Sequence, residues 1–234
     1  MHYLQPTGLR LPASNAVLAS RFVFGFSYVF WFLFIFVTLF FALMSLHSCI
    51  SNNQNQDSEQ RKIEADSLVR NISNIDSLKA IYSQYQSEEN AEGQMMTLKQ
   101  LGKCQREQNK FADAIESHSN GQNIAIELCD TPEIVHALNN IGTNYRRMSM
   151  LEDATTFHYQ ALKYCEEYRD KESYQAKKNR VVSLNGIGNI SLRLGDYETA
   201  DSVFRAALAG EKNLGSALGQ AINYANLGAI FEEE

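Results

Sequence analysis

The sequence predicts an all-α solenoid, built from helix-turn-helix repeats of about 40 residues, that follows an N-terminal hydrophobic helix. The first observation is that LNNIGTNYRRMSMLEDA (138–154) returns as LNGIGNISLRLGDYETA (184–200), with seven of seventeen positions identical. The second is that apolar residues recur at three- and four-residue steps on both sides of a short break in each copy, which indicates two amphipathic helices. The third is an uncharged run of 25 residues over 22–46, long enough to span a bilayer as a helix.

The N-terminal hydrophobic run, FVFGFSYVFWFLFIFVTLFFALMSL, contains nine of the chain's thirteen phenylalanines. At about 1.5 Å per residue, a helix of this length exceeds the hydrocarbon core of about 30 Å. The preceding region, residues 1–21, contains Arg10 and Arg21 and no acidic residue. Because positive charge favours the cytoplasmic side, we expect residues 50–234 on the outer side of the membrane.

The end of this run, Leu46-His47-Ser48-Cys49, resembles the signal of bacterial lipoproteins. The resemblance implies that residues 22–49 form a signal peptide, with cleavage before Cys49 and lipidation of its thiol. His47 and the length of the hydrophobic run depart from that pattern, and the alternative is an uncleaved transmembrane anchor. Under both interpretations, residues 50–234 are tethered at a bacterial cell envelope, on the periplasmic side.

The rest of the chain divides into a tether, an N-terminal segment and repeats. Residues 50–60 are polar after Ile50 and predict a solvated tether. In residues 61–94, apolar residues at helical spacing predict helices that form a cap or a degenerate repeat. Thr131-Pro132 is typical of a helix start, and Gly215-Ser216 of a helix end followed by a new cap. The predicted repeats are 95–130, 131–176, 177–216 and 217–234, and because the last stops before its second helix, we expect a piece of a longer protein.

Glycines at positions 102, 142, 188 and 228 each follow a large residue by four positions, and the first three precede an alanine and an aromatic or histidine residue at fixed distances. Over residues 95–234 this arrangement resembles the tetratricopeptide repeat, although the glycines lie 40 to 46 residues apart, against about 34 in the common unit. The resemblance implies a right-handed solenoid in which glycine and alanine allow paired helices to approach closely. It also implies that the first helix of each repeat lines a concave groove that binds proteins or peptides.

The groove positions of the tetratricopeptide family, transferred repeat by repeat, mark a set of polar residues as the candidate binding face. Asparagine amides can donate to and accept from the backbone of an extended peptide, and arginine can fork onto a carboxylate. We expect Asn139, Asn185 and Asn226 to hold the ligand backbone, and Arg147 and Arg193 to attract acidic groups. The full set is Lys99, Lys103 and Arg106 in the first repeat, Asn139, Asn140, Thr143, Arg146 and Arg147 in the second, Asn185, Asn189 and Arg193 in the third, and Asn226 in the fourth.

Other kinds of chemistry have no support in the sequence. Residues 50–234 contain 19 basic and 27 acidic groups, a net charge of about −8, which disfavours a nucleic-acid partner. No P-loop, nucleophile elbow or His-Glu-x-x-His helix occurs. His118 and His158 occupy equivalent repeat positions, which predicts packing rather than metal binding, and we expect His136 to be exposed. Three cysteines are expected to be packed side chains without a disulfide framework: Cys104, Cys129 and Cys165.

These observations together predict a membrane-tethered scaffold that binds a protein or peptide through the concave face of its repeats. They predict no enzyme activity, no cofactor, no metal, no nucleic-acid partner and no small-molecule substrate. The membrane contact is expected through residues 22–46 or through lipidated Cys49. The alternative function is the extracytoplasmic sensor portion of a longer signalling protein, with a histidine kinase or DNA-binding output beyond residue 234. A module for self-association is the least specific alternative.

Overall fold

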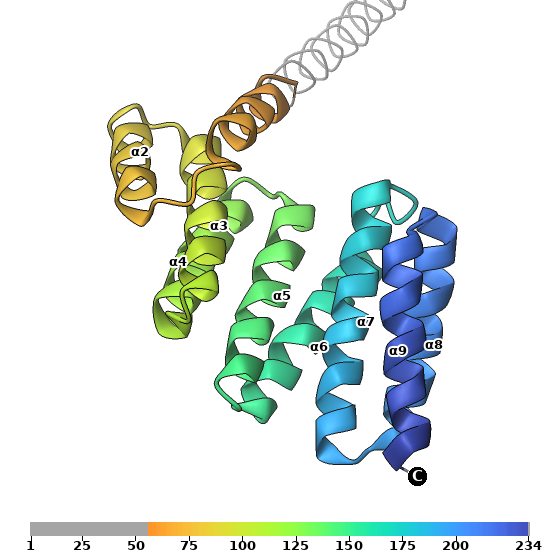
Figure 1. The fold of residues 1–234 in the computed structure, drawn as a ribbon. Coiled ribbons are helices and arrows are strands. Elements are labelled where there is room, and N and C mark those ends of the chain that lie inside the picture. The colour runs from red at the N-terminus through yellow and green to blue at the C-terminus, as the bar shows by residue number, and fades with distance from the viewer. Residues whose placement is uncertain (1–55, 234) are drawn as a thin grey trace, which may run out of the picture. The chain divides into compact units, whose positions relative to one another are not determined.

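The computed structural model describes residues 56–233, and this part of the chain is all-helical, with no strand (Figure 1). The predicted hydrophobic segment 22–49, which includes Cys49, lies outside the described residues. Within the described part, no helix is both long enough and apolar enough to cross a membrane. A helix over residues 56–69 is followed by α2 (Ile75–Ser87), α3 (Ala91–Glu107), α4 (Phe111–Glu127), α5 (Thr131–Arg147), α6 (Leu151–Glu167), α7 (Tyr174–Leu194), α8 (Tyr197–Leu214) and α9 (Ala217–Glu233).

Consecutive helices pack against each other along a stack (Figure 1). Short turns join α3 to α4, α5 to α6 and α7 to α8, so that each of these pairs is antiparallel. Helix α5 also contacts α7, and α7 contacts α9. We call α3, α5 and α7, the first helices of the three complete pairs, the first-helix layer. This arrangement confirms the predicted all-α fold of stacked helix pairs.

The helix borders agree closely with the predicted repeats. Helices α5 and α9 begin where the second and fourth repeats were predicted to begin, whereas α3 and α7 begin four and three residues before the predicted starts. N-capping explains the earlier starts, because the Asn90 side chain accepts a hydrogen bond from the Gly93 N–H and Ser173 Oγ accepts one from the Ala176 N–H. The first helices thus begin at or up to four residues before the predicted repeat starts, at positions set by local capping.

The polar tether predicted over 50–60 is wrong for its described part, which is helical from residue 56. Lys62 Nζ lies 2.7 Å from a carboxylate oxygen of Glu59, one helical turn away, and such pairs support a solvated helix. Val69, at the end of the same helix, is completely buried. The composition of this segment is polar, but the apolar residues that follow it anchor a helix that includes residues 56–60.

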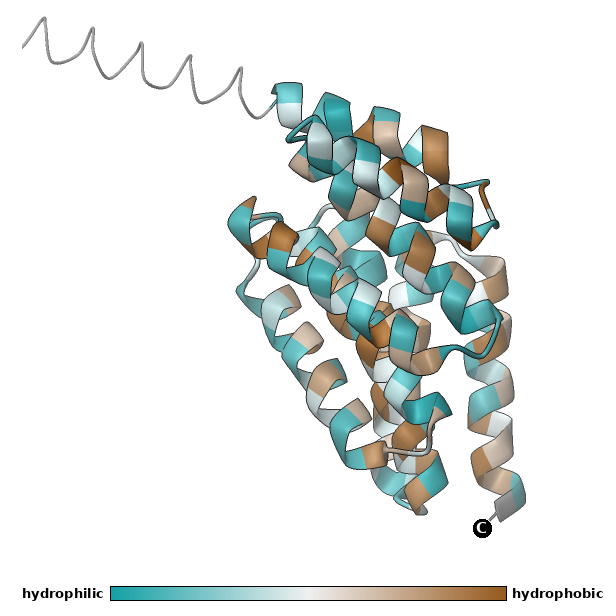
Figure 2. Ribbon diagram, turned by 90° about the vertical axis from the view of Figure 1, so that its left-hand side faces the viewer, coloured by the Kyte–Doolittle hydropathy of each residue, from teal (hydrophilic) through white to brown (hydrophobic). Residues whose placement is uncertain are grey.

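The hydrophobic core is distributed along the stack rather than gathered at one centre. The largest cluster includes Val69, Leu78 and Leu138, and further clusters form around Leu184 and Phe204. Figure 2 accordingly shows hydrophobic and hydrophilic residues on every helix. Each pair therefore buries its apolar surface largely against its neighbours, which is the packing of repeat proteins.

Close approach within each helix pair depends on glycine, as the sequence predicted. In three pairs, a Cβ added to the glycine of the first helix would lie less than 3.0 Å from a buried ring of the second helix. At the corresponding position in α9, an added Cβ would meet no atom within 4 Å. The three contacts are Gly102 with His118 (2.6 Å), Gly142 with His158 (2.9 Å) and Gly188 with Phe204 (2.6 Å). Both histidines are therefore packed side chains.

The prediction of packed cysteines is correct for two of the three. Cys104 and Cys165 are buried, whereas Cys129 is exposed, and all three thiols are free. Cys129 lies in the turn between α4 and α5 with a φ of 55°. A residue in this left-handed conformation ends a helix and points away from its packed face, so the prediction of burial was wrong there.

Candidate functional site

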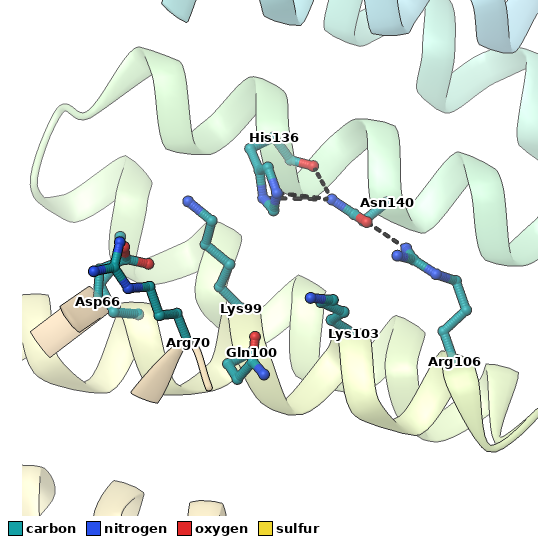
Figure 3. A pocket seen from close by; sticks show the side chains of 9 residues that line it. Asp66, Arg70, Lys99, Gln100, Lys103, Arg106, His136 and Asn140 are labelled. Carbon is teal, nitrogen blue, oxygen red and sulfur yellow. Dashed lines mark hydrogen bonds between the residues drawn. The ribbon is translucent and has the colours of Figure 1, made fainter. Parts of the chain in front are cut away.

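A basic cavity lies where α3 and α5 meet the end of the helix over residues 56–69 (Figure 3). Its volume is about 230 Å³. In Figure 3, Lys99 and Lys103 extend from α3 toward α5, and Arg106 meets Asn140 at one end. Four cations, one acid, a histidine, two amides and a methionine line the cavity: Arg70, Lys99, Lys103, Arg106, Asp66, His136, Gln100, Asn140 and Met96. The structure thus brings four predicted residues together and adds five others.

Acidic residues neutralise the end of the cavity that is nearest the start of α5. Lys99 Nζ lies 2.9 Å from Glu133 Oε1, and Lys62 Nζ lies 2.9 Å from Asp130 Oδ2. Both acids stand at the N-terminus of α5, where the helix dipole also favours negative charge. An adjoining cavity of about 300 Å³ is lined by Lys62, Lys99 and Glu133 among others. An anionic ligand would compete with the chain's own carboxylates at this end.

The opposite end of the cavity has no such neutralisation. Lys103 is exposed, and no carboxylate lies within 4.0 Å of its amine or of the Arg106 guanidinium in the part of the chain that the structure describes. Arg106 Nη1 donates a hydrogen bond to Asn140 Oδ1, and Asn140 Nδ2 donates to the backbone oxygen of His136 at 2.8 Å. The amide of Asn140 therefore holds the guanidinium in place and leaves its other N–H groups for a ligand.

His136 is half-buried and lines the cavity, so the expectation of an exposed side chain was wrong. Burial lowers its pKa well below the ordinary value, and the positive charges of Lys99 and Arg106 lower it further. The imidazole is therefore neutral at pH 7, and its Nε2 lies 3.2 Å from Asn140 Nδ2. The i, i+4 spacing of His136 and Asn140 was the sequence signal that could have placed both on one face.

Further arginines gather at the ends of α5 and α7. Arg193 Nη1 donates to the backbone oxygen of Arg146 at 3.1 Å, and its Nη2 lies 3.3 Å from Ser149 Oγ. Arg147 is exposed, while Arg146 is half-buried and its Nε has no hydrogen-bond partner among the described residues. Burial lowers the pKa of Arg146, and the charges of Arg147 and Arg193 lower it further. Three like charges are therefore close enough to repel one another.

Asn139 does not reach the candidate face, so the prediction that it holds ligand backbone was wrong. Its side chain is 2% exposed and lies between α5, α6 and α7. Asn139 Oδ1 is 3.0 Å from His158 Nδ1, and its Nδ2 donates to Ser183 Oγ at 3.0 Å. The physical reason is that the packed His158 ring needs an acceptor, and Asn139 is the amide that meets it.

The remaining predicted residues are less available than expected. Thr143 Oγ1 donates to the backbone oxygen of Asn139 at 2.8 Å, and Asn189 Nδ2 donates to that of Asn185 at 2.7 Å. Asn185 is half-buried, and its Oδ1 is a buried atom without a partner among the described residues. Asn226 is half-buried on α9. Most of these amides and hydroxyls serve the helices themselves, and the cations form the chemically active part of the face.

Comparison with known proteins identifies the fold. No family model and no curated protein matches the chain. A similar solved structure is the crystal structure of BtubC (BKLC) from P. vanneervenii, with a TM-score of 0.56 and 19% sequence identity. The match covers 75% of this chain and 66% of the BtubC chain, just under two thirds of it. At this identity the likeness shows the fold alone and does not test the prediction that the chain is not an enzyme.

Proposed function

We propose that the chain is a membrane-tethered tetratricopeptide scaffold that binds a protein or peptide segment through the first-helix layer. The observation that carries this proposal is the cavity between α3 and α5, where Lys103 and Arg106 have no carboxylate partner among the described residues. Glu107 lies one turn from Lys103, just as Glu167 lies one turn from Lys163 on α6, but of these two pairs only Lys163 and Glu167 form an ion pair, at 3.8 Å. Unpaired cations around a cavity instead favour an external acceptor.

Two features of the sequence support the rest of the proposal. The repeated glycine, alanine and ring positions support the tetratricopeptide assignment and its right-handed stacking, because the glycine-to-ring contacts recur in three pairs. The uncharged run 22–46 supports attachment to a bacterial cell envelope, as a transmembrane helix or through lipidated Cys49, with residues 50–234 on the periplasmic side.

A charge-reversal experiment tests the binding face. The full chain is expressed with a C-terminal affinity tag, and proteins that co-purify from membranes are identified by mass spectrometry. Arg147→Glu combined with Arg193→Glu should abolish capture of the specific partner, because the face then repels acidic groups. Circular dichroism should show unchanged helix content, since Arg147 is exposed and Arg193 is exposed as well.

The matched control reverses two charges on second helices. Lys163→Glu on α6 together with Lys212→Glu on α8 changes the net charge by the same amount, and both lysines are exposed. This control should capture the partner as the wild-type chain does. Recovery of the same partners by the arginine variant would show that the first-helix layer is not the binding face.

A further inference from the structure

Arginine is concentrated in the last turns of the first-helix layer. The last turns of α3, α5 and α7 all contain arginine, whereas those of α4 and α6 contain no basic residue and that of α8 contains only Lys212. The helix dipole favours a cation at every helix C-terminus, so it does not explain this difference. The four side chains, which we call the arginine row, are Arg106, Arg146, Arg147 and Arg193.

The members of the arginine row belong to one end of the stack. The turns that join α3 to α4, α5 to α6 and α7 to α8 lie at the same end in Figure 1. The charge of Arg147 lowers the pKa of both Arg106 and Arg146, after the larger effect of burial, and the charge of Arg193 lowers that of Arg146. The row is therefore electrostatically continuous from α3 through α5 to α7.

No ion pair neutralises this concentration of positive charge in the part of the chain that the structure describes. The first turns of α4, α6 and α8 contain acids at the same end, but no carboxylate lies within 4.0 Å of any member of the row. Glu107 acts on Arg106 by its charge without forming an ion pair. In contrast, Lys62 on the helix over residues 56–69 and Lys99 in the middle of α3 are paired with Asp130 and Glu133 at the start of α5. Like charges held together unpaired are unfavourable unless an anion binds.

The geometry of the stack limits the form of that anion. Helices α5 and α7 contact each other, packed helix axes are separated by about 8–10 Å, and an extended peptide advances about 3.3 Å per residue. A peptide that crosses from α5 to α7 therefore meets the next helix end after roughly three residues, and the hydrogen bond from Arg106 to Asn140 shows that the end of α3 lies beside α5 as well. Arginine also suits carboxylates in particular, because its planar guanidinium can donate two parallel hydrogen bonds to one of them.

We propose that the arginine row binds an extended acidic segment of a partner protein, with its carboxylates about three residues apart along the peptide. This inference rests on the proposed function and specifies the chemistry of its partner. The segment crosses the C-terminal ends of α3, α5 and α7, and the paired lysines near the start of α5 contribute little. Affinity therefore depends on salt, since Arg147 and Arg193 are exposed to solvent.

Synthetic peptides test the inference with the full chain in detergent micelles. The first probe is a short fluorescent peptide with aspartate at every third position in a serine and alanine background. The second has asparagine in place of each aspartate, and the third has the same number of aspartates placed consecutively. Fluorescence anisotropy should show that the first probe binds about tenfold or more tightly than the second, and more tightly than the third, with affinity falling as salt rises.

Variants then test whether the first probe binds to the arginine row. Arg106→Gln, Arg147→Gln and Arg193→Gln together should weaken the first probe by about tenfold or more. Arg147→Lys with Arg193→Lys keeps the charge but loses the fork, so its effect should be smaller. The control Lys163→Gln with Lys212→Gln should leave the affinity unchanged.

Several results would overturn the inference. These are equal binding of the aspartate and asparagine probes, equal or tighter binding of the consecutive probe, absence of binding by all three, and binding that survives the triple glutamine variant. The proposed function fails separately, when charge reversal at Arg147 and Arg193 leaves partner capture intact. A chain that captures its partner through this face but does not prefer the first probe keeps the proposed function and loses this inference.

Discussion

The second and third helix pairs accommodate different rings at the same repeat position. We call the space that the glycine of the first helix leaves for a ring of the second helix the glycine slot. In the second pair, His158 packs against Gly142, and in the third, Phe204 packs against Gly188. The residue nineteen positions before each ring is asparagine in both pairs. Asn139 Oδ1 lies 3.0 Å from His158 Nδ1, whereas Asn185 Oδ1 is buried without a partner among the described residues. The comparison teaches that glycine makes room for either ring, and that in these two pairs only the histidine ring has the amide of the first helix as a hydrogen-bond partner.

The first helix pair combines a histidine ring with a different residue on the first helix. There the ring is His118, and the residue nineteen positions earlier is Lys99, which has no acceptor to offer. His118 Nε2 is buried without a partner among the described residues, and the same is true of His158 Nε2. Burial lowers the pKa of His118 to about 3, and the charges of Arg106 and Lys99 contribute to that shift. A histidine of this kind is tolerated only while it stays neutral.

Acidification should therefore destabilise the chain through the two helix pairs that contain histidine and not through the pair that contains phenylalanine. The resulting loss in the free energy of unfolding is the largest effect that we expect. Burial lowers the pKa of His158 to about 4 and, with nearby charges, that of His118 to about 3. The unfolded chain titrates near 6.5 and so binds protons first as the pH falls. The contribution of each neutral histidine to the free energy of unfolding is fully present above pH 6.5 and is lost as the pH falls from there to the folded pKa. From pH 7 to pH 5, the free energy of unfolding should drop by about 2 kcal/mol for each histidine.

Replacement of His118 by phenylalanine, the ring of the third pair, tests this prediction directly. Urea denaturation, followed by circular dichroism at both pH values, gives the free energy of unfolding. His118→Phe should reduce the acid-induced loss by about 2 kcal/mol, because phenylalanine cannot bind a proton, and Phe204→His should increase it. An acid-induced loss that is the same in His118→Phe and wild type would contradict the prediction.

Alanine in place of glycine should have opposite effects on the free energy of unfolding at Gly188 and at Gly228. A Cβ at Gly188 would lie 2.6 Å from the Phe204 ring, which is completely buried and cannot move aside. Gly188→Ala should therefore lower the free energy of unfolding by about 2 kcal/mol. Gly228→Ala is the matched control, since no atom lies within 4 Å of its Cβ, and alanine should raise stability by up to about 1 kcal/mol there. Equal effects at both sites would show that the slots are not closely packed.

The smallest expected difference concerns the two asparagines. Asn139→Ala removes the acceptor of the His158 N–H and leaves a buried donor unpaired, which should cost about 1–2 kcal/mol. Asn185→Ala removes an amide whose oxygen already lacks a partner, and it should change stability by less than about 0.5 kcal/mol. Both values come from urea denaturation at pH 7. A larger loss for Asn185→Ala than for Asn139→Ala would contradict the interpretation that Asn139, unlike Asn185, is the hydrogen-bond partner of the ring in its helix pair.

The candidate site was only partly predictable. Lys99, Lys103, Arg106 and Asn140 do line one cavity, but the pairing of Lys99 with Glu133 was not visible in the sequence. That ion pair joins residues 34 positions apart on different helices, and no local pattern specifies it. The family's groove positions also do not take account of hydrogen bonds inside the core. Asn139 occupies a groove position, yet its amide is the hydrogen-bond partner of the buried His158 ring.

The sequence by itself determined the helix pairs, their borders and the positions of the glycine slots, because helical periodicity and capping are properties of short stretches of chain. Only the tertiary structure decided which polar residues face a ligand and which face a neighbouring helix. Asn139 and Asn140 are adjacent, yet the first is buried beside His158 and the second lines the basic cavity. One residue turns a helix by about 100°, so the position of the next helix decides which of the two reaches the surface.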